Sequence, residues 1–293
     1  MLELLDLDLS KNSETLEISD LNNLKKSLQY LKLRNPITNL TDCIGLFSNG
    51  MFSKLIGLCI IQCERISNEL LIAITRNCPM LESLELDLNI GRNYSLSQNI
   101  GIVSLSNLLN LKTLKLANAK LIKPKSWMEL FQDKHLKLLQ VLDLSECQGM
   151  TNEVLHTISM NCTNLQFLKL DFNQSEVDNI SSLSILHQLK ALELKFLQSI
   201  SNNWNALFCN KNLQNLVLLD LTGCFGITDT VLETISLNCP NLDSLNLKET
   251  DFWKWTSIIQ YQDTDNIHMF GNIETLNGQN CDRLSEYLEI YLK

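Results

Sequence analysis

Cysteine is the residue type whose spacing in this sequence could do chemistry. Three similar stretches of the chain each contain two cysteines. The pairs are Cys63 and Cys78, Cys147 and Cys162, and Cys224 and Cys239. Such pairs could hold a metal ion, form disulfides or pack in an apolar interior. A zinc site needs ligands that converge on one point, often from CxxC or HxxxH spacings. The four histidines of the chain are scattered, so the sequence does not favour a metal site.

A leucine pattern that runs through the chain indicates which elements carry these cysteines. The pattern LxxLxL recurs every 24 to 31 residues, with a degenerate last copy at Ile273. The regular copies start at Leu2, Leu28, Leu55, Leu81, Leu111, Leu139, Leu165, Leu189, Leu216 and Leu242. Because successive residues of a strand face opposite sides, Leu142 and Leu144 point one way and Asp143 the other. A single unit cannot bury its leucines alone, so the period predicts stacked repeats.

This pattern resembles the leucine-rich repeat family, whose general signature is LxxLxLxx(N/C)xL, from Leu2 to the end of the chain. The resemblance implies an α/β fold, a right-handed solenoid or horseshoe with a concave parallel β-sheet and helices on the convex side. We expect one domain of about eleven repeats over residues 1–293, whose last strand is poor. Residues 281–293 are predicted to form a capping helix, because Leu284, Leu288 and Tyr291 make one apolar stripe.

The cysteine stretches also carry the signals of a helix start. Ser67, Thr151 and Thr228 are predicted N-caps, and each lies between two apolar residues that form a hydrophobic staple. The staple pairs are Ile66 with Leu71, Met150 with Leu155, and Ile227 with Leu232. The second cysteine of each stretch then lies on the buried helix face, and the first lies just past the strand. We interpret both as packing residues, without metal or cofactor. Unpaired buried thiols fit a reducing compartment, so a cytoplasmic or nuclear location is expected.

A more specific form, CxxIT(D/N)xxLxxIxxxCPxLxxL, resembles the cysteine-containing repeats of F-box/leucine-rich-repeat proteins. The best match consists of Cys224, Ile227, Thr228, Asp229, Leu232, Ile235, Cys239 and Pro240. The copy at Cys147 departs from it at Met150, Asn152 and Thr163. In that family an F-box docks onto a ubiquitin ligase core while the repeats hold the substrate. No F-box precedes Leu2 here, so the resemblance implies a ligase adaptor as partner only if an upstream F-box exists. Related proteins that lack the box also use such repeats.

A longer cycle of three repeat types is visible in the aromatic residues. Phe47, Phe131 and Phe208 each lie eight residues before a cysteine-type repeat. Trp127 and Trp204 share a helix face with Phe131 and Phe208, at i and i+4. We predict that these rings fill the convex side, with a second, convex binding site as the alternative. The first repeat is of the type that follows a cysteine-type repeat, so we expect a fragment, a truncated isoform or a partner-capped start.

Composition argues against several functions. The net charge of −9 disfavours general attraction to nucleic acid or anionic lipid, which requires a basic surface. No apolar run is long enough to span a membrane. The sequence contains no HExxH, no GxSxG, no P-loop and no phosphate-binding glycine fingerprint, so we predict no enzyme and no cofactor.

Function is therefore expected on the outward-facing strand residues. The central outward residues are Asp6, Lys32, Cys59, Glu85, Lys115, Asp143, Lys169, Glu193, Asp220 and Asn246. Their signs alternate from Glu85 to Glu193, which predicts either a ladder of cross-strand pairs or a mixed surface that binds a protein or peptide. The predicted partner-binding residues on the concave face are Tyr30, Lys32, Glu85, Lys115, Asp143, Phe167, Lys169, Glu193, Lys195 and Asp220.

Within that set, Phe167 and Lys169 are predicted contact residues. Phe172 and Phe196, at strand exits, either join the same patch or tuck into the core. If binding lies elsewhere, the loop around Asp251 to Trp255 is the alternative. The function we predict is protein binding, as the substrate-recognition repeats of an F-box-type (SCF) ubiquitin ligase receptor. The alternative is a non-ligase scaffold or inhibitor that masks a protein partner.

Overall fold

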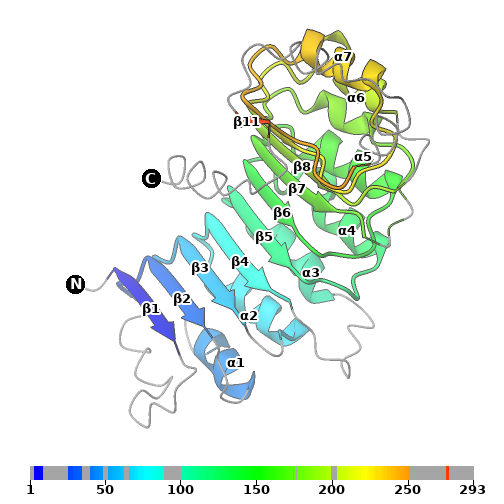
Figure 1. Cartoon of the computed structure of the whole chain (residues 1–293). Helices are drawn as coiled ribbons and strands as arrows, with labels where there is room; N and C mark the ends of the chain where they lie inside the picture. The colour runs from blue at the N-terminus through cyan, green and yellow to red at the C-terminus, as the bar shows by residue number, and fades with distance from the viewer. Residues whose placement is uncertain are drawn as a thin grey trace. The chain divides into compact units, whose positions relative to one another are not determined.

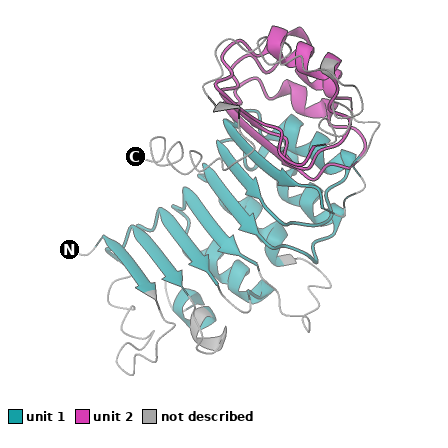
Figure 2. Cartoon of the chain, in the orientation of Figure 1, with its two compact units in different colours: residues 1–177 teal, residues 178–293 magenta. Residues whose placement is uncertain are grey.

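The computed structural model describes residues 3–8, 26–34, 40–48, 52–62, 66–88, 100–173, 175, 177–198, 203–250 and 275–276. The chain forms two compact units, residues 1–177 and residues 178–293 (Figure 2). In each unit, strands and short helical segments alternate along the chain, as the leucine period predicts (Figure 1). The expected single domain over residues 1–293 stays a prediction beside this division into units.

The first unit contains a parallel sheet whose described strands pair in chain order. They are β1 (Leu4–Asp8), β2 (Tyr30–Arg34), β3 (Gly57–Ile61), β4 (Ser83–Asp87), β5 (Thr113–Ala117), β6 (Val141–Leu144) and β7 (Phe167–Asp171). The α-helices between them are α1 (Leu40–Ser48), α2 (Asn68–Asn77), α3 (Ile100–Ser104), α4 (Pro124–Phe131) and α5 (Asn152–Asn161). Two 3-10 helices, η2 (Leu105–Asn107) and η3 (Gln132–Lys134), follow α3 and α4.

The second unit repeats this arrangement. Its described strands, β8 (Ala191–Lys195), β9 (Leu218–Asp220), β10 (Ser244–Asn246) and β11 (Thr275–Leu276), are parallel and pair in chain order. The helical segments are η4 (Ser181–Ile185), α6 (Trp204–Phe208), η5 (Cys209–Lys211) and α7 (Asp229–Asn238). Two residues of the last repeat, those of β11, are described, and the expectation of a poor last repeat stays a prediction. The predicted capping helix over residues 281–293 and the loop from Asp251 to Trp255 lie outside the described residues.

The leucine pattern builds the core because its residues share one face of each strand. Leu142 and Leu144 are fully buried, whereas Asp143 between them is half-buried. Full burial of one leucine side chain stabilises the fold by about 1.5–3 kcal/mol before chain entropy is subtracted. The predicted α/β leucine-rich-repeat solenoid, with helices behind a parallel sheet, is confirmed.

The three predicted N-cap residues all precede helices, but only two of them make the cap bond. Ser67 Oγ accepts a hydrogen bond from the Leu70 amide at 3.2 Å, and Thr151 Oγ1 accepts one from the Val154 amide at 3.4 Å. Thr228 makes no cap bond, since its hydroxyl lies 2.9 Å from the hydroxyl of Thr230. A local side-chain bond of this kind competes with capping. Thr228 is thus the N-cap residue of α7, as predicted, but its side chain does not form the cap bond.

The cysteines of the repeats pack in the interior. The thiols of Cys147 and Cys224 donate to backbone carbonyls of the preceding repeat, Leu116 O and Leu194 O, both at 3.0 Å. The second cysteines of the three stretches, Cys78, Cys162 and Cys239, are buried residues that follow the last helical residue. Burial raises the pKa of both the Cys147 thiol and the Cys162 thiol to about 12. The packing interpretation is confirmed for these residues, while Cys63 lies outside the described part.

Two buried tryptophans tie the convex side to the cysteine turns. The Trp127 ring stacks on Phe131 with centroids 6.4 Å apart, and the Trp204 ring stacks on Phe208 at 6.5 Å. The indole nitrogens donate to the carbonyls that follow the first cysteines, Gln148 O at 2.8 Å and Phe225 O at 3.0 Å. All four rings are buried, so they fill the interior on the helical side of the sheet as predicted, and the alternative of a second binding site on that side stays a prediction.

A ladder of asparagines, which the sequence analysis missed, links successive repeats. Each side-chain amide donates to a backbone carbonyl of the preceding repeat. The bonds join Asn110 to Pro79, Asn164 to Lys137, Asn215 to His187, and Asn241 to Gln214. The signal was present in the sequence, because each of these asparagines stands directly before the first leucine of an LxxLxL copy.

Candidate protein-interaction surface

The outward residues of the first unit form a continuous line across its strands. Strand register places Asp6, Lys32, Cys59, Glu85, Lys115, Asp143 and Lys169 side by side, one on each strand from β1 to β7. We call these seven residues the outward row. None of them is buried, whereas the leucines on either side of each one in β2 to β7 mostly have less than 3% of their surface exposed. The register predicted from the leucine period is therefore correct.

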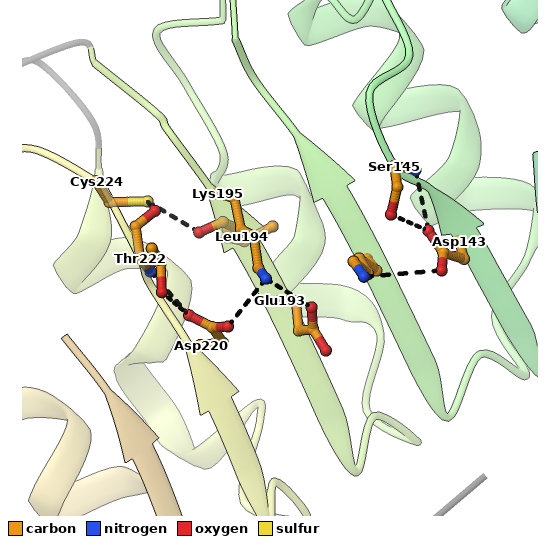
Figure 3. A network of polar contacts seen from close by, with 9 residues as sticks. Asp143, Ser145, Glu193, Leu194, Lys195, Asp220, Thr222 and Cys224 are labelled. Atoms are coloured by element: carbon orange, nitrogen blue, oxygen red, sulfur yellow. Dashed lines mark hydrogen bonds and ion pairs between the residues drawn. The ribbon is translucent and has the colours of Figure 1, made fainter. Parts of the chain in front are cut away.

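Ion pairs occur at the two ends of the outward row. The Arg34 guanidinium donates to Asp6 at 2.7 Å. Asp143 lies 4.0 Å from the Lys169 amine, and its Oδ1 accepts bonds from the Ser145 amide and hydroxyl at 2.9 and 2.5 Å (Figure 3). These carboxylates are engaged within the fold.

The middle of the outward row is different. Lys32, Glu85 and Lys115 make no ion pair within 4.0 Å with any other residue that the structure describes. Of the ladder predicted from Glu85 onward, the first unit therefore shows only the pair of Asp143 with Lys169. Cys59 stands between Lys32 and Glu85. The pKa of the Cys59 thiol is raised to about 11, mainly by burial. The Glu85 carboxylate also raises this pKa, and its effect is larger than the opposite effect of Lys32. The thiol is therefore neutral at pH 7, and it does not neutralise either neighbour.

Tyr30 borders the outward row at the start of β2, where 45% of its surface is exposed. Its ring lies directly over Gly57 of the adjacent strand, since a Cβ on that glycine would lie 2.5 Å from Tyr30 Cδ1. A larger residue at this position would therefore displace the ring from its present place. The arrangement holds an exposed aromatic ring beside Lys32, as the sequence predicted for a binding residue.

Phe167 departs from the prediction. Its strand phase points outward as expected, but only 5% of its surface is exposed. Register places it beside Val141, which is itself beside Thr113, and these two are 7% and 2% exposed. Neighbours about 4.8 Å apart on one face of a sheet cover one another. The prediction of Phe167 as an exposed contact residue is therefore wrong, whereas Lys169 in the same strand stays half-exposed.

The outward residues of the second unit form a closed polar network rather than an open surface. The Lys195 amine lies 3.6 Å from Glu193 and 3.4 Å from Asp220, and these carboxylate residues are 3% and 2% exposed (Figure 3). Asp220 Oδ1 also accepts bonds from the Thr222 amide and hydroxyl at 2.9 and 2.5 Å. Burial opposes the charge on Lys195, but the two carboxylates together outweigh it and raise the pKa of that amine. Glu193 and Asp220, both predicted to bind a partner, are thus buried.

The two phenylalanines at strand exits also belong largely to the interior. Phe172 is 2% exposed, so its predicted alternative, packing in the core, is confirmed. Phe196 has a positive φ of 57° and is half-buried. A Cβ on Gly223 would lie 2.4 Å from its ring, so the ring covers that glycine much as Tyr30 covers Gly57.

Two further searches concern only the described parts of the chain. Their His, Cys, Asp and Glu side chains form no group of three or more that could hold a metal ion. Their helices include none that is both long and apolar enough to cross a membrane.

Comparisons with known proteins give the following likenesses. No family model matches the chain. It is 28% identical over 184 residues to the Protein SUPPRESSOR OF npr1-1, CONSTITUTIVE 1 of Arabidopsis thaliana, a match that covers 55% of the chain and 12% of that protein. The chain thus matches only a small part of the length of this relative.

Two solved structures are similar to the chain. Internalin C2 of Listeria monocytogenes is 21% identical, with 80% of each chain covered and a TM-score of 0.49. The structure of the Rad7 and Elc1 complex in yeast matches with 18% identity and a TM-score of 0.51, over 85% of this chain and 70% of the other. The likeness to the yeast structure supports the leucine-rich-repeat fold described above.

Proposed function

We propose that the chain binds a protein partner through the outward row of its first unit, as the substrate-recognition repeats of an F-box-type ubiquitin ligase receptor. The observation that carries the binding part is the open centre of the row. Lys32, Glu85 and Lys115 are half-exposed, without ion pairs among the described residues, and Tyr30 supplies an exposed ring beside them. Tyrosine and charged groups that are already positioned are typical of interface anchors.

Support for the ligase part is the resemblance of the cysteine-type repeats to those of F-box proteins. The yeast neighbour is also a complex, of Rad7 with Elc1, which fits a repeat domain that assembles with another protein. A cytoplasmic or nuclear location belongs to the same proposal, since the seven cysteines whose side chains the structure describes are free thiols.

A scaffold or inhibitor that masks its partner is the second candidate. It requires only a repeat array, which the described strands and helices supply. Co-purification of the ligase adaptor with the product of the full-length transcript distinguishes the two candidates. The adaptor is expected with the receptor and not with the scaffold.

The binding part is tested with two charge-matched variants. The swap variant, Lys32→Glu/Glu85→Lys/Lys115→Glu, reverses the centre of the outward row. The control variant, Lys120→Glu/Glu146→Lys/Lys137→Glu, makes the same changes at exposed residues elsewhere in the first unit and preserves the 3.7 Å pair of Lys120 with Glu146. Proteins captured by the tagged chain are identified by mass spectrometry. The proposal predicts partners that the control variant retains and the swap variant loses. Identical sets of partners for both variants would contradict it.

A further inference from the structure

The spacing of the three charges that form no ion pair with another described residue specifies the shape of the partner. Lys32, Glu85 and Lys115 lie on β2, β4 and β5 of one parallel sheet, in one register. With about 4.8 Å between strands, Glu85 is about 10 Å and Lys115 about 14 Å from Lys32 along the row. A partner that lies along the row must present three complementary charges at those distances on one of its faces.

An α-helix satisfies this requirement. With a rise of 1.5 Å per residue, positions i, i+7 and i+10 of a helix lie at 0, about 10.5 and about 15 Å. Positions i and i+7 share one face, and i+7 and i+10 are neighbours on that face. Each position deviates from the row by roughly 1 Å or less, which long Lys and Glu side chains absorb.

An extended segment does not fit. Side chains on one face of a strand repeat about every 6.7 Å, so they fall at 0, about 6.7 and about 13.4 Å. The charge that must meet Glu85 would then lie about 3 Å from the place where it is needed, or on the opposite face of the segment.

The surroundings of the row are compatible with a docked helix. Cys59 is the outward residue of β3, between Lys32 and Glu85. Its side chain is short and neutral, so it leaves room for a helix that lies across the strands. Tyr30, with its ring against Gly57, offers an apolar contact next to Lys32. Any transient pairing between the half-exposed charges is weak, so exchanging it for contacts with a partner costs little.

We infer that the outward row binds an α-helix that carries an acidic residue at i, a basic residue at i+7 and an acidic residue at i+10. This inference rests on the proposed function, and it adds the partner's conformation and charge pattern. The helix lies across the strands from β2 to β5 of the first unit. Its acidic residues face Lys32 and Lys115, and its basic residue faces Glu85.

Three synthetic 18-residue peptides test the inference against the full chain. The first carries Glu, Lys and Glu at i, i+7 and i+10 and is held helical by a lactam bridge on the opposite face. The second has the inverted pattern, Lys, Glu and Lys, on the same helix. The third keeps the Glu, Lys and Glu of the first, but two prolines replace the bridged residues so that it stays extended.

Dissociation constants are measured by fluorescence polarisation at low and at high salt. The chain is expected to prefer the first peptide over the second by about tenfold, and the preference should shrink in high salt. The swap variant should invert the preference, whereas the control variant keeps it. Equal affinity for the first two peptides, or an unchanged preference in the swap variant, overturns the charge pattern. If the extended peptide binds as tightly as the helical peptide with the same charges, or more tightly, the inferred helical conformation of the partner is wrong.

These outcomes are separate from failure of the proposed function. If the chain captures proteins that the swap variant loses but ignores the helical peptide, protein binding stands and the helical partner is wrong. If both the wild-type chain and the swap variant capture the same proteins, the outward row is not the binding surface.

Discussion

Asp143 in the first unit and Asp220 in the second occupy the same position of the repeat but lie in different environments. Each accepts bonds from the amide and hydroxyl of the residue two positions later, Ser145 or Thr222, with the same pair of distances, 2.9 and 2.5 Å. The side chain of Asp143 is 21% exposed, and that of Asp220 is 2% exposed. The repeat sequence therefore determines the local turn, whereas the packing around each strand determines how much of the carboxylate is exposed to solvent.

The inward faces of the two units, in contrast, are equivalent. Leu144 follows Asp143 and Leu221 follows Asp220, and both leucines are fully buried. Leu144→Asp and Leu221→Asp should each lower the free energy of unfolding by about 4 kcal/mol or more, because each places an unpaired charge in the core. Urea titration measures both. A loss below 1 kcal/mol for either variant would show that its strand is assigned to the wrong face.

Replacement of the outward carboxylates should affect the stability of the two units to different extents. Asp220→Ala should lower the free energy of unfolding by about 2–3 kcal/mol, because it leaves the Thr222 hydroxyl and part of the Lys195 charge without an acceptor in a buried site. Asp143→Ala should stay within about 1 kcal/mol, since water can replace the half-exposed carboxylate. Equal losses in the same urea titrations would remove the distinction between a closed network and an open row.

The cysteines sharpen the contrast between inward and outward positions within one unit. Cys147→Ala should cost about 1–2 kcal/mol, through a small cavity and the lost bond to Leu116 O, and metal chelators should have no effect on its melting. Cys59→Ala in the outward row should cost less than about 0.5 kcal/mol.

The same substitution changes the pH dependence of stability. The pKa of Cys147 in the folded state is about 12, above the ordinary value of 9, so its contribution is present below pH 9 and is lost as the pH rises toward 12. The free energy of unfolding should therefore fall over this range, and less steeply in Cys147→Ala. An identical slope in the two proteins would mean that the Cys147 thiol is exposed.

The smallest expected effect on stability belongs to the swap variant. Lys32, Glu85 and Lys115 make no ion pair with another described residue, so reversing all three charges should change the free energy of unfolding by less than about 1 kcal/mol. The control variant should behave alike. A much larger loss in the swap variant would show that the centre of the row stabilises the fold, in the way the network around Lys195 does.

The leucine period predicted most of the fold, because it marks the residues that each strand buries in every repeat. The LxxLxL copies predicted the positions of the strands, and the i, i+4 spacing of Trp127 and Phe131 predicted that their rings share one buried helix face. Strand alternation could indicate on which side of the sheet Phe167, Glu193 and Asp220 lie, but not what covers them. Their burial depends on neighbours such as Val141 and Lys195 in three dimensions. The missing cap bond of Thr228 depended on a single hydroxyl, that of Thr230, which a repeat pattern does not resolve.

The most direct test of partner binding uses Cys59, which lies in the outward row between Lys32 and Glu85. Its alkylation rate is measured by peptide mass spectrometry at pH 8, with and without a captured partner. Cys209, a half-buried thiol of the second unit outside the row, is the internal control. Binding on the outward row predicts that alkylation of Cys59 slows at least severalfold while alkylation of Cys209 stays constant. An unchanged rate at Cys59 in a saturated complex would contradict the assignment of the outward row as the binding surface.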